Sequence, residues 1–264
     1  MCYNTPDDEL SRCLDSLSGS AVGSVTIVDN SSNEGTRRLL ATTYPHVDYI
    51  ANANTGYGAG HNIALRRTLE NADVQYHLVV NADVSFDHDI IGELTAYLDI
   101  HPTAALIHPR VVHPNGRLQP TCRLLPTPAN LIMRRFCPPI GCLLDRRYLL
   151  ERYDHRSAPV RVPYVQGSFM LLRTAALRET GLFDERFFMY PEDIDLCRRL
   201  RERHDIIYYP AVTITHDHHA ASYHSLRMAM IHSINMVRYF NKWGWIFDRT
   251  RRRLNRDTLR EIFS

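Results

Sequence analysis

The sequence predicts an α/β fold in which a mostly parallel sheet is flanked by helices. Between residues 25 and 107, short apolar runs alternate with segments of helical pattern, which is typical of strand–helix–strand units. Two of the apolar runs, residues 25–28 (VTIV) and 77–80 (HLVV), end directly before Asp or Asn. Ligands on sheets of this kind bind at the carboxyl ends of the strands. We therefore expect the polar residues after these strands to form a ligand site.

The first half of the chain gives the clearest element pattern. Only six residues (MCYNTP) precede the first expected helix, although such a sheet usually begins with a full strand. We therefore expect that the true start of the protein lies upstream of Met1. Hydrophobic spacing predicts helices over residues 7–17, 34–41, 56–69 and 89–100, and strands over residues 25–28, 46–50, 77–80 and 104–107.

The second half is less regular. Residues 111–165 are rich in Pro and Arg and lack periodicity, so we expect an irregular excursion over the ligand-binding face. Regular patterns resume after it and lead to His216. We expect strands over residues 167–172, 206–209 and 212–215, and helices over residues 174–179 and 196–203.

Composition narrows the class of protein. The net charge of +2 gives no general case for nucleic-acid binding. The six cysteines lack paired spacing, and Cys137 and Cys142 have no second pair to complete a zinc site, so we expect reduced thiols. The sequence has no signal peptide pattern and no apolar run of about 18 residues. We therefore expect a cytoplasmic protein.

Two strand ends present groups suited to a nucleotide. Asp29, Asn30 and Ser31 follow the first strand and could bond the edge of a flat heterocycle, or they could simply cap the next helix. Residues 54–62 (NTGYGAGHN) resemble a phosphate-cradling loop before a helix. Their alternating glycines do not match the dinucleotide fingerprint, and a tight turn is the alternative.

Two further strand ends present candidate metal ligands. Asn81 and Asp83 follow the strand over residues 77–80, where a carboxylate can hold a divalent cation or cap a helix. His216 begins the run HDHH at another strand end. Because side chains alternate in direction along an extended chain, one ligand from this run is expected, and His218 and His219 are expected to lie in a solvated loop.

The segment over residues 181–199 (GLFDERFFMYPEDIDLCRR) is the most informative part of the chain. It holds five carboxylates beside aromatic and large apolar residues. Apolar surroundings raise the pKa of a carboxyl group, and a carboxylate with such a pKa suits a general base. The alternative is a helix start, where acidic residues are favoured by the helix dipole.

Taken together and in order, these pieces resemble the inverting GT-A glycosyltransferases of family 2, particularly the rhamnosyltransferase-like branch of bacterial surface polysaccharide synthesis. The segment over residues 181–196 is the most specific part, and residues 119–123 with Pro126 and Thr127 resemble that branch's acceptor-side loop. The resemblance implies a GT-A (Rossmann-like) fold with a single catalytic domain over residues 1–245. The excursion over residues 111–165 would be its acceptor-side insertion.

The resemblance also implies a role for each matching residue. Asp193 matches the catalytic base, with Glu192 as its nearest rival, and Asp83 and His216 match the positions that hold Mg²⁺ or Mn²⁺. Asn81 stands where the family has the first Asp of its metal motif, so metal binding by one carboxylate is expected. The implied donor-binding residues are Tyr3, Asn4, Asp29, Asn30, Asn54, Gly58, Asn62 and Asn81, and the implied acceptor-binding residues are Gln166, Gly167 and Ser168.

The implied reaction moves a sugar, rhamnose or another deoxyhexose, from a nucleotide diphosphate to a hydroxyl of a glycan or lipid-linked glycan, with inversion. Asp184, Glu185 and Asp195 are expected to support the loop that orients Asp193. Two other functions remain open. A nucleotide-sugar binding or scaffold protein without turnover would fit Asn81 and the short first strand. A metal-dependent phosphohydrolase would use Asp83 and the histidines, but it would usually have more ligands.

Residues 246–264 form a basic tail with six arginines. The aromatic run over residues 243–247 (WGWIF) precedes it, and together they predict a peripheral contact with the inner face of the plasma membrane. The alternative is a basic helix that packs Leu254, Leu259, Ile262 and Phe263 against the protein.

Overall fold

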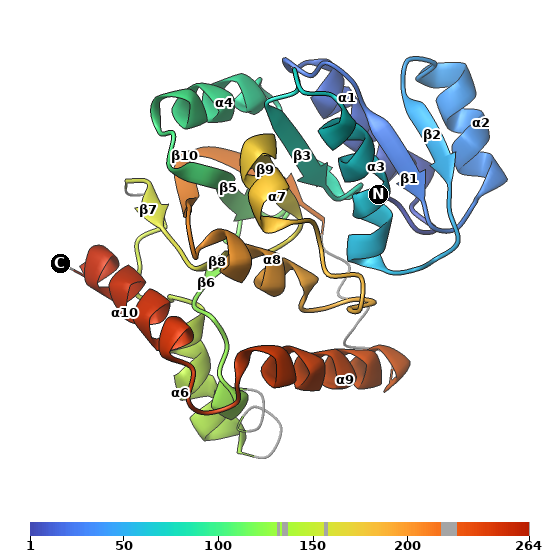
Figure 1. Cartoon of the computed structure of the whole chain (residues 1–264). Coiled ribbons are helices and arrows are strands. Elements are labelled where there is room, and N and C mark those ends of the chain that lie inside the picture. Colours follow the sequence, from blue (N-terminus) through green and yellow to red (C-terminus); the bar gives the residue numbers. More distant parts are fainter. Residues whose placement is uncertain (131–132, 134–136, 156–157, 218–225, 264) are drawn as a thin grey trace.

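The computed structural model describes residues 1–130, 133, 137–155, 158–217 and 226–263. It confirms the predicted α/β class, with helices on both faces of a central sheet (Figure 1). The strands of this sheet are, in spatial order, β3 (Tyr76–Val80), β9 (Phe169–Arg173), β5 (Ala104–Val112), β10 (Asp205–His216) and β4 (Val84–Ser85), with β7 (Val160–Arg161) also paired to β10.

Two smaller sheets lie beside the central one. β1 (Thr26–Asp29) and β2 (Asp48–Ala51) pair in parallel, and β6 (Cys122–Arg123) and β8 (Tyr164–Val165) pair antiparallel. Cys2 forms an isolated parallel bridge to Asp29. The described helices are α1 (Asp7–Ser18), α2 (Glu34–Thr43), α3 (Tyr57–Glu70), α4 (Ile90–Ile100), α6 (Pro138–Tyr148), α7 (Thr174–Thr180), α8 (Glu192–Leu200), α9 (Leu226–Trp243) and α10 (Arg249–Phe263).

The central sheet is mixed, which corrects the expectation of a mostly parallel one. β9 lies between β3 and β5 and runs antiparallel to both, so that Leu172 pairs with His77 and with Leu106. Because neighbouring antiparallel strands are joined at the same end of a sheet, the chain between β5 and β9 needs no crossover helix. As a result, residues 166–168 at the start of β9 lie beside Asn81 at the end of β3.

Side chains alternate between two buried clusters along the central strands, as the pleat requires. Leu106, Leu172 and Ile206 belong to the cluster that also contains residues of α3, α8, α9 and α10. Their neighbours Ile107 and Leu171 belong to the cluster covered by α1, α2 and α4. The sheet is therefore buried on both faces, and the ligand site is confined to its edges and ends.

Three element predictions differ from the structure. The two strands expected over residues 206–215 are one strand, β10, with a bulge between Tyr209 and Thr213. The helix expected from Leu196 begins at Glu192, so Asp193 lies in the first turn of α8. The excursion expected to be irregular contains α6, whose Pro138 and Pro139 occupy the first helical turn, where proline is tolerated because the amide hydrogens there have no helical acceptor.

Most of the basic tail forms helix α10. Most of its apolar side chains pack against the protein, as the alternative to a membrane contact predicted. Leu254 is buried, and Leu259 and Ile262 pack against the same cluster. Phe263 differs, because its side chain is exposed. The six cysteines are free thiols, as expected. The division into residues 1–245 and 246–264 stays a prediction.

Replacing Asp248 with Ala is expected to lower the free energy of unfolding by about 3–5 kcal/mol. Asp248 accepts two hydrogen bonds from Arg198 (2.6 and 2.7 Å), and both side chains are 2% exposed. Removing the carboxylate leaves the Arg198 charge buried without this partner. Urea unfolding measures the change. The exposed Arg12–Asp8 pair provides the matched control, since Arg12→Ala should cost less than about 1 kcal/mol. Equal effects of the two substitutions would contradict the prediction.

Candidate functional site

The candidate site lies where the end of β3, the start of β9 and the first turn of α8 meet. The backbone amide of Asn81 donates to the Ser168 carbonyl oxygen at 3.0 Å. The Gly167 amide donates to Asp193 Oδ2 at 3.0 Å. Three segments far apart in the sequence are thereby joined, so the structure brings the expected acceptor-side and catalytic residues together.

Asp193 is held by donors from β8, from α8 and from the segment between β8 and β9. Its Oδ2 also accepts from the Tyr164 hydroxyl at 3.2 Å, and its Oδ1 accepts from the Ile194 amide at 2.8 Å. Tyr164 belongs to β8, and Ile194 belongs to α8. Because donors on rigid elements fix both oxygens, the carboxylate has a defined direction before any substrate binds.

Burial raises the pKa of both neighbouring carboxyl groups, but to different extents. The pKa of Glu192 is raised well above its ordinary range by burial and by the Asp193 charge. Burial also raises the pKa of Asp193, while the Ile194 and Gly167 amides, the Arg123 charge and the Tyr164 hydroxyl oppose that rise. Glu192 Oε2 is buried and has no hydrogen-bond partner among the described residues. The hydrogen-bond donors around Asp193 thus favour its ionised form, whereas burial favours the protonated form of Glu192.

The loop before α8 is held by the carboxylates expected to support it. Asp184 accepts from Lys242 and Arg186, and Asp195 accepts from Arg199 and from the indole of Trp243. Glu185 is bonded to Asn62 and Arg66. These contacts tie the loop to α3 and α9, which confirms the expected supporting role.

The glycine-rich segment packs α3 against this loop. A Cβ atom at Gly56 (φ +114°) would lie 2.4 Å from the Phe188 carbonyl oxygen, and one at Gly58 would lie 2.8 Å from Phe183 Cβ. Asn62 is buried. Its side-chain nitrogen donates to the Phe183 carbonyl oxygen, and its Oδ1 accepts from the Phe183 backbone amide. For Gly58 and Asn62, the structure thus gives contacts to the protein itself. Their effect on a donor would be exerted through the loop that they hold.

Asp83 and His216 face each other across the sheet end. His216 Nε2 lies 3.3 Å from Asp83 Oδ1. The Gln119 amide nitrogen donates to the His216 carbonyl oxygen at 2.7 Å, which turns Gln119 Oε1 toward His216 Nδ1 at 3.0 Å. Nδ1 therefore carries a hydrogen, and in the neutral ring Nε2 presents its lone pair to Asp83.

This geometry fits a divalent cation. Asp83 Oδ1 is buried and accepts no hydrogen bond from the residues that the structure describes. A positive charge between Asp83 Oδ1 and His216 Nε2 would stabilise these two acceptor atoms at this separation. Gln119 fixes the orientation of the His216 imidazole, as residues that hydrogen-bond to metal ligands do. Within the described residues no group of three or more His, Cys, Asp or Glu side chains could hold a metal. Further ligands would have to come from substrate or water. His218 and His219 lie outside the described residues.

The first strand end is organised around Asp29. This buried carboxylate accepts from the Ser31 amide and hydroxyl, the Asn33 amide and the Tyr49 hydroxyl. Burial opposes its ionisation, but these donors outweigh burial and lower the pKa of Asp29. Asn30 is also buried, and its amide bonds Asn52 and the Gly56 carbonyl oxygen. Both residues therefore shape the strand end from within.

The remaining expected donor residues lie on several different segments. Tyr3 and Asn54 have exposed side chains. The Asn4 amide donates to Ser31 Oγ at 3.1 Å. Asn81 Oδ1 lies 3.0 Å from the Tyr57 hydroxyl, which also donates to the Gly167 carbonyl oxygen at 2.6 Å. Tyr57 thus links Asn81 to the segment that contacts Asp193.

Four residues of the site had no role assigned from the sequence. Gln119 orients His216, Tyr57 bridges Asn81 and Gly167, and Tyr164 contacts Asp193. Arg123 donates to Gln166 Oε1 at 3.3 Å, and its charge acts on Asp193. Gln119 and Arg123 do lie in the segment that resembles an acceptor-side loop, which is the one signal that could have found them.

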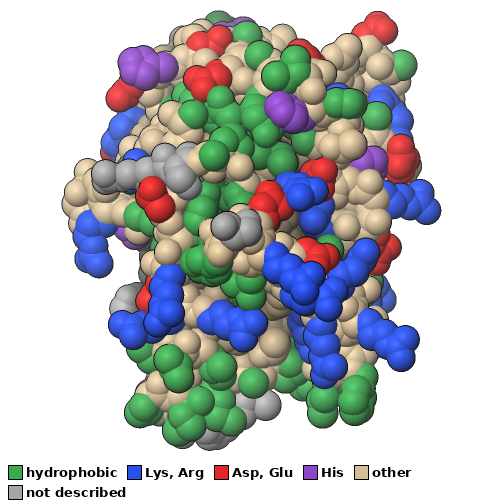
Figure 2. All heavy atoms as spheres, turned by 90° about the vertical axis from the view of Figure 1, so that its left-hand side faces the viewer, with side chains coloured by type: hydrophobic (Ala, Val, Ile, Leu, Met, Phe, Trp, Pro, Cys, Tyr) green, Lys and Arg blue, Asp and Glu red, His purple; other side chains and the backbone are tan. Residues whose placement is uncertain are grey.

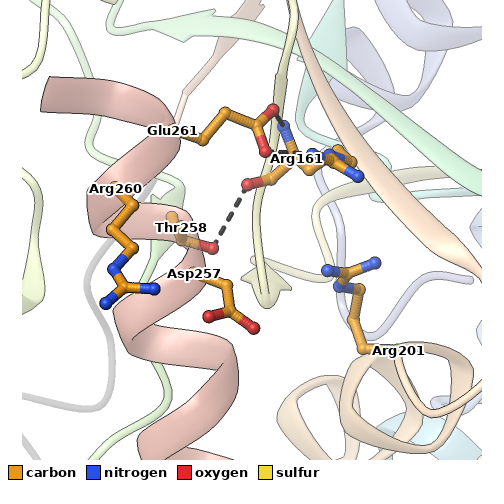
Figure 3. Close-up of a pocket in the computed structure, with 6 residues that line it drawn as sticks. All are labelled: Arg161, Arg201, Asp257, Thr258, Arg260 and Glu261. Carbon is orange, nitrogen blue, oxygen red and sulfur yellow. Dashed lines mark hydrogen bonds and ion pairs between the residues drawn. The ribbon is translucent and has the colours of Figure 1, made fainter. Parts of the chain in front are cut away.

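A second cavity, of about 560 Å³, lies away from these residues, between α10, β7 and the end of α8 (Figure 3). It is lined by Arg161, Arg201, Asp257, Thr258, Arg260 and Glu261. Arg161 pairs with Glu261 at 2.8 Å, and Arg201 pairs with Asp205. Because carboxylates already neutralise two of its three arginines, this cavity gives no case for an anion site.

Known proteins resemble this chain over most of its length. The N-acetylglucosaminyl-diphospho-decaprenol L-rhamnosyltransferase of Mycobacterium tuberculosis is 31% identical over 228 residues, which cover 80% of this chain and 73% of that protein. Rhamnosyltransferase WbbL of Escherichia coli is 25% identical over 201 residues, with 74% and 72% covered.

A solved structure shows the same fold. The mannosyltransferase PcManGT from Pyrobaculum calidifontis, in complex with GDP-Man and Mn²⁺, has a TM-score of 0.58 and 18% identity, covering 90% of this chain and 62% of that one. The family model for "Glycosyltransferase like family 2" matches residues 1–233. This match, together with the rhamnosyltransferase relative, confirms the predicted family. The chain belongs to glycosyltransferase family 2.

Proposed function

We propose that the chain transfers a sugar from a nucleotide diphosphate donor to a hydroxyl of a glycan or lipid-linked glycan, with inversion at the anomeric carbon. The fixed and ionisable Asp193 carboxylate is the observation that carries the proposal. Rhamnose or another deoxyhexose is the proposed sugar, and TDP-rhamnose is the first donor to test. The names of the rhamnosyltransferase relatives support this choice.

Asp193 acts as the general base. It takes the proton of the acceptor hydroxyl as that oxygen attacks the anomeric carbon. The new carbon–oxygen bond forms as the bond to the nucleotide diphosphate breaks on the opposite side, so the configuration inverts. The raised pKa of Glu192 favours its protonated form, which carries no negative charge beside Asp193. Gln166, Gly167 and Ser168 would border the acceptor, and Asp29 would contact the base of the donor.

Asp83 and His216 would hold the proposed Mg²⁺ or Mn²⁺ ion. When bound there, the ion supplies positive charge that stabilises the departing diphosphate. Gln119 keeps the His216 imidazole in the tautomer that a metal ligand requires. Asn81 is a neutral partner of Tyr57 in this arrangement, so Asp83 is the proposed anionic ligand.

A ligand screen followed by a transfer assay tests the proposal. Nucleotide-sugars are compared by thermal shift with and without Mn²⁺, and the donor that stabilises the protein is then incubated with lipid-linked acceptors. Stabilisation by a deoxyhexose donor followed by sugar transfer is the expected result. Stabilisation without transfer to any acceptor would instead favour the binding or scaffold function, for which Asn81 remains the motivating observation.

The rate of sugar transfer is expected to rise with pH through the pKa of Asp193 and then to level off. Burial raises that pKa above its ordinary value, and the base works only as a carboxylate. Activity is therefore lost as the pH falls through the raised pKa. The pH dependence of kcat/KM measures this limb. A rate that increases toward acid pH would contradict the assignment.

We also propose that the protein works on the cytoplasmic side, at the inner face of the plasma membrane, where a lipid-linked acceptor would be available. None of the helices in the described part of the chain is long and apolar enough to span a bilayer. Because α10 turns Leu254, Leu259 and Ile262 toward the protein, its own apolar side is not free for lipid, and a membrane contact has to use other residues.

A further inference from the structure

Exposed apolar side chains gather at one end of the molecule. Eleven large hydrophobic side chains are exposed among the described residues. Eight of them lie on α6, on α9 or on the connection over residues 244–248, and these three segments lie together at the lower end of Figure 1. We call this end the base. Its exposed members are Ile140, Leu143, Met230, Ile234, Val237, Trp245, Ile246 and Phe247.

Helix α9 has two apolar sides. Met236, Tyr239 and Phe240 are buried against the protein. Met230, Ile234 and Val237 are 60%, 46% and 45% exposed, and their spacing of four and then three residues puts them in one row. A helix that is apolar on its outer side as well is expected to have a partner there.

The connection and α6 extend this row. Phe247 is 88% exposed and Ile246 is 65% exposed, directly before α10. Leu143 and Ile140 are 67% and 50% exposed on α6. Single exposed apolar residues are ordinary on a protein surface, whereas a group of this size marks an interaction surface.

The base and the adjoining helix α10 are strongly basic. Helices α6, α9 and α10 with the connection over residues 244–248 contain eleven Lys and Arg against four Asp and Glu, a net charge of +7 in a chain whose total is +2. Figure 2 shows apolar side chains gathered at the lower end of this face, with a band of Lys and Arg above them. Apolar groups bordered by cations are complementary to an anionic lipid surface, in which headgroups lie above the hydrocarbon.

A pocket of about 260 Å³ lies between α6 and α10. It is lined by Leu124, Leu125 and Leu144 and by four arginines. Two of these, Arg251 and Arg256, pair with Asp248 and Asp257, and the other two are Arg147 and Arg252. None of the described lining residues is acidic. Arg147 and Arg252 thus add positive charge beside apolar lining residues, a combination that suits a phosphate attached to a lipid chain.

We propose that the base docks the protein on an anionic bilayer surface through α9, α6 and the connection over residues 244–248. The purpose of this docking, which is to hold a lipid-linked acceptor near Asp193, rests on the proposed function. Helix α9 also contacts the loop before α8, because Asn235 and Arg238 donate to the carbonyl oxygens of Met189 and Arg186. Docking through α9 would therefore keep that loop in place.

Vesicle flotation in the absence of any donor tests the docking. The protein is expected to float with vesicles of phosphatidylcholine and phosphatidylglycerol and to remain behind with phosphatidylcholine alone. The double substitution Ile246→Ser with Phe247→Ser should weaken partitioning about tenfold or more, because two apolar side chains no longer leave water. The matched control is Ile100→Ser, since Ile100 is 75% exposed on α4, and it should leave partitioning unchanged.

Charge is tested with a second pair of variants. Arg252→Glu should weaken partitioning about fivefold or more, and added salt should weaken that of the wild type. Arg37→Glu on α2, where Arg37 is 67% exposed, is the control and should have little effect. Equal partitioning of wild type to both vesicle types, or an equal loss with Ile100→Ser, would overturn the proposal.

Two further measurements distinguish lipid docking from self-association and from sugar transfer itself. Size-exclusion chromatography that shows a dimer, converted to a monomer by Ile246→Ser with Phe247→Ser, would overturn the proposal in favour of a self-association surface. Sugar transfer to a detergent-dispersed acceptor should be unchanged in the same variant. Loss of docking with intact transfer in this variant supports the docking proposal. Intact docking without transfer in the wild type would count against the proposed function alone.

Discussion

Replacing Asp193 with Asn is expected to lower sugar transfer about 10²- to 10⁴-fold, the usual contribution of a general base. The amide keeps the shape of the carboxylate and its place beside Gly167 and Tyr164, but it cannot accept the acceptor proton. Donor binding should stay near the wild-type level, because the proposed donor contacts lie on other segments. Transfer rates and donor affinity are measured separately for the purified variant.

Glu192→Gln is the matched control for this prediction. The neighbouring carboxyl group is buried and its pKa is raised well above the ordinary range, by burial first and then by Asp193. A raised pKa in the folded state means that stability is lost as pH rises above the pKa of the unfolded chain. Glu192→Gln should therefore retain most transfer. Its free energy of unfolding should rise relative to that of the wild type as the pH increases. If Glu192→Gln abolishes transfer and Asp193→Asn does not, the base is Glu192.

Replacing Asp83 with Asn is expected to raise the concentration of Mn²⁺ needed for transfer about 100-fold or more, because an anionic ligand is replaced by a neutral one. Gln119→Ala should raise it about 10- to 100-fold, the usual effect of losing a partner that orients a metal ligand. Thermal shift with Mn²⁺ and a nucleoside diphosphate gives a readout that does not depend on turnover.

The control for the metal prediction is a change near the site but outside the ligand pair. Gln166→Ala removes a contact with Arg123 and should leave the Mn²⁺ requirement unchanged, whatever it does to the use of acceptor. Transfer by Asp83→Asn with wild-type Mn²⁺ dependence would contradict the proposed metal site.

The fold was predictable wherever hydrophobic spacing is local. The first half of the sheet and its helices were located within a few residues, because strand and helix periods differ over short windows. Helix α6 was missed, since Pro138 and Pro139 resemble breakers and its neighbour α10 lies about a hundred residues later in the chain. The antiparallel direction of β9 was missed because strand direction depends on where the intervening chain returns to the sheet.

The site was predictable as a set of strand ends, and its connections were not. Asp83 and His216 were candidates from their positions after apolar runs, and the family resemblance singled out Asp193 within the carboxylate cluster. Gln119 contacts His216 across 97 residues, and Tyr57 contacts Gly167 across 110 residues. Such contacts leave no local pattern, since the residues next to a Gln or Tyr do not show which distant segment its side chain will contact.

The sequence by itself determined the fold class, the family and the carboxylate pair in the most specific segment of this protein. Only the tertiary structure decided which donors surround each member of the pair, how His216 is oriented, and that Gly58 and Asn62 hold a loop. The physical reason is that apolar periodicity is a property of neighbouring residues. The pKa of a carboxyl group, the tautomer of a histidine and the exposure of Phe247 depend instead on burial and on partners that folding brings from distant parts of the chain.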